Sequence, residues 1–242
     1  MRAETRHQLK TDRFTQATIE AAEATAHWTA EHKPKLIAGI AIAVVVLAAL
    51  SGGWYYLSQQ DDKANMELTK AVRTLQTQVR PAGAPETPNA PPSFASAQDR
   101  ATAAKKQLQD VIDKYPHTHT ADFARYLLGT TAVELGDKAT AERQLKDAAS
   151  TRNSDLAALA KVALAAFYGN NNRTKEAVDL YKELIDKPTT TVSKVMAQMQ
   201  LAALYETSQQ PLEAKRTYEQ IVKENPKSEA ESMAQSKLQA LK

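Results

Sequence analysis

The sequence contains no cysteine among its 242 residues, only seven glycines, and 6% aromatic residues. The absence of cysteine excludes disulfides, thiolate zinc sites and a lipid-modified cysteine anchor, and it is compatible with either redox compartment. The scarcity of glycine and aromatic residues, together with abundant alanine, argues against sheets and favours closely packed helices. We therefore predict an all-α fold.

A strong charge of either sign is also absent. Lysine and arginine exceed aspartate and glutamate by 31 to 28, which gives a formal net charge of +3. Residues 1–35 carry six basic and five acidic residues, and residues 59–242 carry 25 and 23. Neither part has the positive field that nucleic-acid binding requires, so no nucleic-acid partner is expected.

One segment is long and apolar enough to leave water. It runs from Leu36 to Leu57 with the sequence LIAGIAIAVVVLAALSGGWYYL and contains no charged residue. As a helix of about 33 Å it matches the hydrocarbon thickness of a bilayer. Trp54, Tyr55 and Tyr56 lie at its end, where aromatic rings favour the headgroup region. We predict a single transmembrane helix over residues 36–57.

A cleaved signal peptide is the alternative interpretation, since Ala49 and Ser51 are small residues at cleavage-like spacing. However, 35 residues precede the segment and its apolar run exceeds the 7–15 residues typical of a signal peptide. An uncleaved anchor is favoured. The basic residues of the tail (1–35) and the acidic Asp61 and Asp62 predict a cytoplasmic N-terminus in the inner membrane and an extracytoplasmic, periplasmic remainder.

Residues 59–80 are predicted to form a stem helix. An apolar stripe with spacings of four, four, three and four runs along it through Ala64, Leu68, Val72, Leu75 and Val79. The stripe needs a partner, which is either another copy in a coiled coil or, as we favour, the downstream domain. Residues 81–96 contain five of the ten prolines and are predicted to be an extended loop.

Residues 97–242 are repetitive. Alanines recur at intervals of 37, 36 and 37 residues, at Ala104, Ala141, Ala177 and Ala214. A large side chain follows each by four residues, at Leu108, Leu145, Tyr181 and Tyr218. A large–small pair precedes each of the last three, at Leu128–Gly129, Leu164–Ala165 and Leu201–Ala202. Small residues at such positions allow two helices to approach closely.

This pattern resembles the tetratricopeptide repeat, a helix-turn-helix unit with a Leu-Gly pair on its first helix and an alanine and an aromatic on its second. Arg125, Lys161 and Gln198 stand where the repeat has tryptophan. The resemblance implies a tetratricopeptide-like α-solenoid of about four helical hairpins, with the stem as the first helix of the first unit. A capping box at Ser228 and Glu231 predicts a final capping helix.

The order of tail, span, stem and repeats also resembles a narrower family, the membrane-anchored ancillary subunits of the SecYEG translocon. That resemblance implies a periplasmic docking domain whose partners are translocon subunits and a membrane-anchored chaperone or prolyl isomerase. A scaffold in envelope or outer-membrane assembly, or in cell division, is the alternative function.

The resemblance to the repeat implies a concave groove lined by the first helix of each unit. The implied positions are mostly apolar and comprise Phe123, Tyr126, Thr130, Glu134, Leu159, Val162, Ala166, Met196, Met199 and Ala203. An apolar groove with methionines suits an amphipathic helix or an extended apolar segment of a partner. The alternative is that the stem or the final helix packs into the groove and buries it internally.

Catalytic groupings are scarce. His117 and His119 are two residues apart in a predicted loop and could supply two metal ligands, but no third ligand accompanies them. A metal protein or enzyme built on this pair is therefore the least favoured alternative. We predict a non-enzymatic protein with no cofactor and no metal site.

Overall fold

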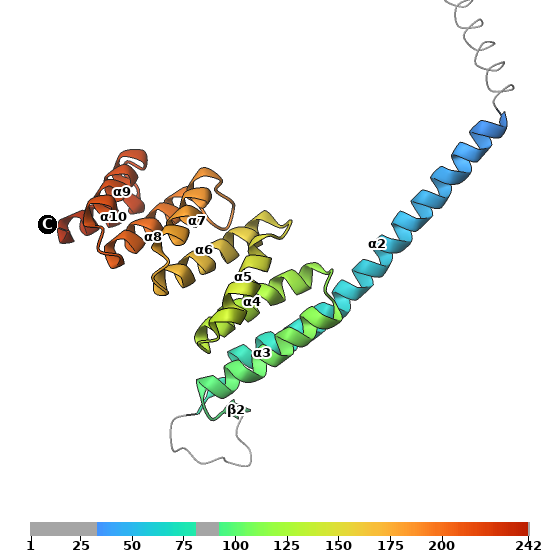
Figure 1. The fold of residues 1–242 in the computed structure, drawn as a ribbon, viewed down its shortest axis with the longest axis horizontal. Coiled ribbons are helices and arrows are strands. Elements are labelled where there is room, and N and C mark those ends of the chain that lie inside the picture. The colour runs from blue at the N-terminus through green and yellow to red at the C-terminus, as the bar shows by residue number, and fades with distance from the viewer. Residues whose placement is uncertain (1–32, 81–91, 242) are drawn as a thin grey trace, which may run out of the picture. The chain divides into compact units, whose positions relative to one another are not determined.

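The computed structural model describes residues 33–80 and 92–241, most of which lie in helices (Figure 1). This confirms the all-α prediction. The chain divides into two compact units with the boundary between Tyr56 and Leu57. The predicted cytoplasmic tail (residues 1–32) and most of the Pro-rich loop (residues 81–91) lie outside the described residues. The division into tail, span, stem, loop and repeats stays a prediction.

The first unit contains the N-terminal part of helix α2, which runs from Lys33 to Gln76. Pro34 lies in its first turn, where the missing N–H costs nothing. The predicted anchor residues from Leu36 onward lie in this helix, and Trp54, Tyr55 and Tyr56 are exposed. The segment is long and apolar enough to cross a membrane and is a candidate span.

The boundaries of the stem differ from the prediction. The predicted span and the predicted stem both lie in the one continuous helix α2. The predicted helix to residue 80 is wrong at its end, since α2 stops at Gln76 and strand β1 (Gln78–Val79) follows. Strand β1 pairs with a second short strand, β2 (Ser93–Phe94).

The β1–β2 pair is parallel, with Gln78 opposite Ser93 and Val79 opposite Phe94. The Arg80 N–H also donates to the Phe94 carbonyl at 2.9 Å. These bonds give the backbone polar groups at both ends of the Pro-rich segment a partner that a helix cannot provide there. This short strand pair was not predicted.

The second unit continues as a chain of antiparallel helices in which each helix contacts the next (Figure 1). Their bounds are α3 (Ala97–Lys114), α4 (His119–Glu134), α5 (Lys138–Ala149), α6 (Ser154–Asn170), α7 (Thr174–Asp186), α8 (Lys194–Thr207), α9 (Pro211–Glu224) and α10 (Glu229–Ala240). The repeating alanines are fully buried between the paired helices. α10 packs on α9, as a capping helix would.

The turns within the hairpins repeat a single backbone geometry. Gly136, Asn172 and Gln209 all have a positive φ, at 72°, 61° and 57°, and they recur at the period of the repeat. This left-handed conformation ends the first helix of each hairpin and satisfies its last carbonyls. Glycine adopts it without cost, whereas glutamine does not.

Helices α4 and α5 approach each other closely at a glycine. Gly129 of α4 faces Leu145 of α5, and a β-carbon at Gly129 would lie 2.6 Å from the Leu145 Cγ. Leu145 is fully buried. The glycine is therefore required by packing, as the Leu-Gly pair of the repeat implies.

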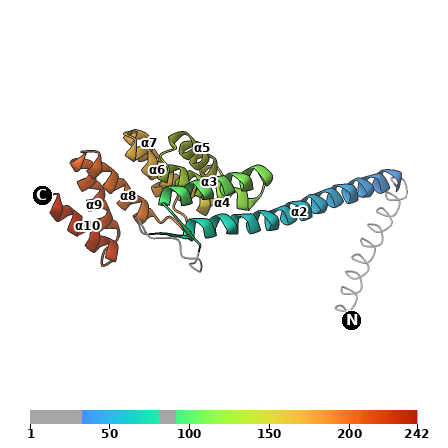
Figure 2. The ribbon, with the colours of Figure 1, turned by 90° about the horizontal axis from the view of Figure 1, so that it is seen from below.

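Within the second unit, the C-terminal part of α2 packs beside α3 (Figure 2). The stripe residues Ala64 and Leu68 join Leu108 and other residues of α3 and α4 in one hydrophobic cluster. The Thr120 N–H of α4 also donates to the Asp61 carboxylate at 2.9 Å. The predicted stem thus packs against the repeat domain of its own chain.

Candidate protein-binding surface

The predicted groove residues come from α4, α6 and α8, the first helices of three successive hairpins. α4 contacts α6, and α6 contacts α8, so the three helices are neighbours in the order of the repeats. This arrangement follows from the period of the sequence, because hairpins of similar length place equivalent helices side by side.

On α4, the groove positions combine one exposed ring with polar groups. Phe123 is 38% exposed, and its ring centre lies 6.0 Å from that of the half-buried Tyr126. The Thr130 hydroxyl donates to the Leu127 carbonyl, so its bonding capacity is partly used within the helix. Glu134 is exposed and lies 3.5 Å from Arg100 of α3.

On α6 and α8, the groove positions form a shallower apolar surface. Leu159 and Val162 are partly buried and pack against the core, as does Met199. Met196 remains 39% exposed in the first turn of α8, and Ala203 is half-buried. The exposed apolar groups therefore concentrate at Phe123 and Met196.

The stem packs on other α4 residues than the predicted groove positions. The α4 residues in its cluster are Ala124, Leu127 and Leu128. Phe123 and Met196 each keep more than a third of their surface exposed. The assignment of the groove positions as a binding surface stays a prediction.

Polar side chains replace the tryptophan of the repeat, and each reaches a partner. The Arg125 guanidinium binds Asp122 at 2.7 Å, the Lys161 ammonium binds Glu183 at 2.7 Å, and the Gln198 amide donates to Glu224 at 2.9 Å. Of the three, only Gln198 is buried, and its bond to Glu224 joins α8 to α9, as the bond of Lys161 joins α6 to α7. The sequence identified these three positions, but it did not identify the side chains that they contact.

A second polar network joins α5 to the α6–α7 turn. Arg173 binds Glu142 at 2.7 Å and lies 4.0 Å from the centre of the Tyr168 ring, while the Tyr168 hydroxyl donates to Glu142 at 3.1 Å. The Arg173 guanidinium, with Lys146, lowers the pKa of Glu142 to about 2. Hydrogen bonds from Gln220 and Gln198 and the nearby Lys194 also lower that of Glu224 to about 2. Arg173, Gln198 and Lys194 act from a neighbouring element, whereas Lys146 and Gln220 belong to the same helix as the carboxylate whose pKa they lower.

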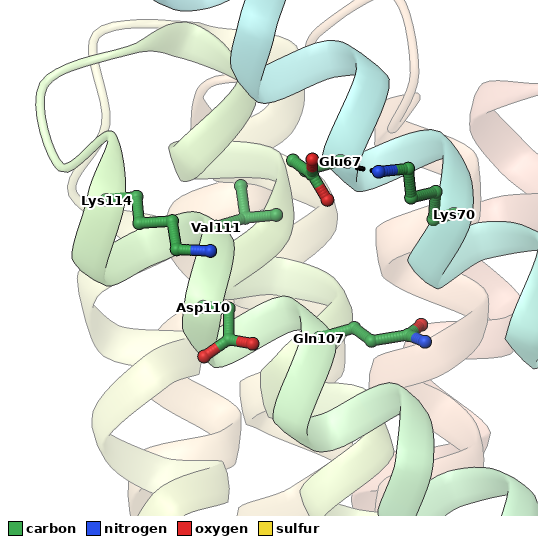
Figure 3. A pocket seen from close by; sticks show the side chains of 6 residues that line it. All are labelled: Glu67, Lys70, Gln107, Asp110, Val111 and Lys114. Atoms are coloured by element: carbon green, nitrogen blue, oxygen red, sulfur yellow. Dashed lines mark hydrogen bonds and ion pairs between the residues drawn. The ribbon is translucent and has the colours of Figure 1, made fainter.

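A cavity of about 110 Å³ lies where α2 meets α3 (Figure 3). Lys70 binds Glu67 at 2.9 Å and lowers the pKa of that carboxyl. Figure 3 shows Asp110 and Lys114 on the α3 side. Two of the four charged side chains that line this cavity are acidic and two are basic.

The predicted histidine pair lines a larger cavity of about 580 Å³, between the α3–α4 and α5–α6 turns. His117 and His119 lie there with Arg125 and Arg152. No group of three metal-ligating side chains occurs within residues 33–80 and 92–241. Sequence reasoning missed this cavity, because it brings together two turns that are about 35 residues apart and share no motif.

The geometry defines the class of the molecule as an α-solenoid of helical hairpins joined to a long apolar helix. The model of a family described as tetratricopeptide repeat-like domain matches residues 26–182, more than half of the chain, and a tetratricopeptide repeat model matches residues 196–228. The chain belongs to the tetratricopeptide repeat-like domain family. No characterised protein and no solved structure gives a significant match.

Family membership sets the broad functional class. Tetratricopeptide domains are typically non-catalytic modules for protein interaction, so the repeats indicate a protein-binding scaffold role. The matched region begins before the apolar part of α2 and ends within α7, so the apolar helix and the repeats belong to one family unit.

Proposed function

We propose that this protein is a bitopic inner-membrane docking protein whose extracytoplasmic repeat domain holds partner proteins close to the membrane. The observation that carries the proposal is the continuity of α2, whose residues 37–57 are exposed and whose C-terminal part packs into the repeat domain. A tether of this kind raises the effective concentration of the groove near membrane-bound partners, so that weak contacts suffice.

The proposed partners are subunits of the SecYEG translocon and a membrane-anchored periplasmic chaperone or prolyl isomerase. The resemblance of the domain order supports this assignment, and the basic bias of the tail supports the orientation of the chain in the membrane. We infer that the N-terminus is cytoplasmic and that the repeat domain is periplasmic.

The groove supports an apolar partner segment. Phe123 and Met196 are exposed, whereas Tyr126 and Met199 are partly buried and would form the floor beneath them. Flexible methionines and a tilted aromatic pair adapt to varied apolar side chains. An amphipathic helix or an extended apolar strand fits this lining.

Purification of the full-length protein from native membranes in mild detergent, with mass spectrometry of co-purifying proteins, tests the partner assignment. Recovery of translocon subunits and a prolyl isomerase is expected. Recovery of outer-membrane assembly or cell-division components instead would overturn the assignment of the partners but not the proposal that the protein is a membrane tether.

The groove is tested by Phe123→Glu, with Leu212→Glu as the matched control. Leu212 is 72% exposed on α9, outside the groove, and introduces the same charge. Phe123→Glu is expected to abolish capture of the partner while the helical circular dichroism stays unchanged. Equal capture by both variants would refute the groove.

The topology is testable because the chain has no native cysteine. A single cysteine in the repeat domain, at the exposed Ser232, should react with a membrane-impermeant maleimide in spheroplasts. A cysteine in place of Thr5 should react only after lysis. The reverse pattern would overturn the proposed orientation.

A further inference from the structure

The cavity between the α3–α4 and α5–α6 turns contains charged groups that the proposed groove does not use. His117 comes from the α3–α4 turn and His119 is the first residue of α4, whereas Asp147 lies in the last turn of α5 and Arg152 in the α5–α6 connection. At about 580 Å³ the cavity is in the size range of ligand sites, and it opens to solvent.

Some of the lining groups are already bonded. Arg125 is held by Asp122 at 2.7 Å and by the Pro116 carbonyl at 3.0 Å, so it forms a fixed cationic wall. The N–H groups in the first turn of α4 donate to Asp61 and Thr118, and those of α6 donate to Asn153. These four backbone N–H groups are therefore already bonded within the protein.

The remaining groups are free. The side chains of His117, His119, Asp147 and Arg152 are exposed and have no hydrogen-bond or ion-pair partner among the described residues. One of them is a permanent cation, two are imidazoles, and one is a carboxylate. Three of these four side chains can therefore donate a hydrogen bond, and only one is an anion.

One repeat later, the corresponding loop and helix start are joined by hydrogen bonds. There the α7–α8 loop folds over the start of α6, where the Thr191 N–H and hydroxyl donate to Asp155 at 3.1 and 3.0 Å. The α5–α6 connection (Ser150–Asn153) is shorter than the α7–α8 loop, and the space beside it is open to solvent.

We propose that this cavity binds a carboxylate side chain on an acidic peptide segment of a partner protein. The Arg152 guanidinium has the planar fork that binds a carboxylate at two points, and the imidazoles can donate beside it. The Asp147 carboxylate, which lines the cavity, repels a phosphate dianion more strongly than a carboxylate monoanion. A cavity of this size also accommodates the residues flanking the carboxylate. The site is separate from the apolar groove and does not depend on it.

The test uses full-length protein in detergent and two rhodamine-labelled, acetylated octapeptides, one alternating Glu and Gly and the other alternating Gln and Gly. Fluorescence anisotropy should show binding of the Glu peptide and weaker binding of the Gln peptide. Arg152→Gln should weaken the Glu peptide about tenfold, the loss expected for one charged hydrogen-bonded contact. The double variant His117→Ala, His119→Ala should also weaken it.

Arg143→Gln is the matched control, because Arg143 is exposed on α5, lies outside the lining and removes the same charge. An unchanged Kd for this variant supports the site. An equal loss in both arginine variants would reveal general charge attraction and overturn it. Equal binding of the two peptides, no binding at millimolar concentration, or tighter binding of a phosphoserine peptide would each overturn the carboxylate assignment.

Discussion

Replacement of Gly129 by alanine should destabilise the repeat domain, although alanine is the better helix former. The new β-carbon would lie 2.6 Å from Leu145 Cγ, 2.8 Å from Cδ2 and 3.2 Å from the Leu145 backbone nitrogen. The last contact matters most, because a backbone atom cannot rotate away. Relief therefore requires α4 and α5 to move apart.

The size of the effect follows from two opposing terms. Overpacking of a buried site costs about 1–3 kcal/mol, and the fully buried Leu145 places this case near the upper end. Exchange of glycine for alanine inside a helix contributes about 1 kcal/mol in the other direction. We expect a net loss of about 2 kcal/mol in the free energy of unfolding.

The matched control is Gly169→Ala on α6. Its β-carbon would lie 2.7 Å from Leu204 Cδ1 alone, which is the end of a flexible side chain. We expect a change within about 0.5 kcal/mol, because rotation of Leu204 offsets the gain in helix propensity. Urea unfolding of full-length protein in detergent, followed by circular dichroism, gives both values.

A second measurement isolates the contact between the two residues. Leu145→Ala alone should cost about 2–5 kcal/mol, but in combination with Gly129→Ala the two losses should fall short of additivity by about 1 kcal/mol or more. Additive losses, or a Gly129→Ala variant as stable as Gly169→Ala, would refute the close-packing argument.

Two further predictions concern turns and ion pairs. Gln209→Gly should raise the free energy of unfolding by about 0.5–1 kcal/mol, because φ is 57° there, and thermal melting should show no gain for the neighbouring Gln210→Gly. Glu142→Gln should cost about 1 kcal/mol at neutral pH, a value reduced for solvent screening. Since the folded pKa of Glu142 is about 2 and the ordinary value is 4.5, its contribution is complete above pH 4.5 and disappears as the pH falls to 2. A difference between wild type and Glu142→Gln that stays constant over this range would contradict the assignment.

The repeat was predictable because its signals are local. Alanines at a fixed period, large residues four positions later and cap residues such as Ser228 each act within one or two turns of helix. The helices appear where these signals place them, and Ser228 caps α10 as expected. The apolar run was equally predictable, since length and composition alone identify a candidate span.

The end of the stem helix could not be predicted from the local sequence pattern. Its stripe predicted a helix to Val79, but the last residues leave the helix to pair with Ser93 and Phe94, which lie beyond the Pro-rich segment. Strand pairing between residues about 15 positions apart leaves no periodic mark in so short a stretch. Helical period alone could not find this end.

The sequence by itself determined the class of helices, the period of the hairpins, the apolar helix and the positions of the closely packed small residues. Each of these depends on neighbours within a few residues along the chain. Only the tertiary structure decided which polar group each unusual residue meets, such as Gln198 with Glu224, and which turns enclose a cavity, as at His117 and Arg152. Those pairings join residues about 26 to 35 positions apart, and their geometry exists only once the hairpins have stacked.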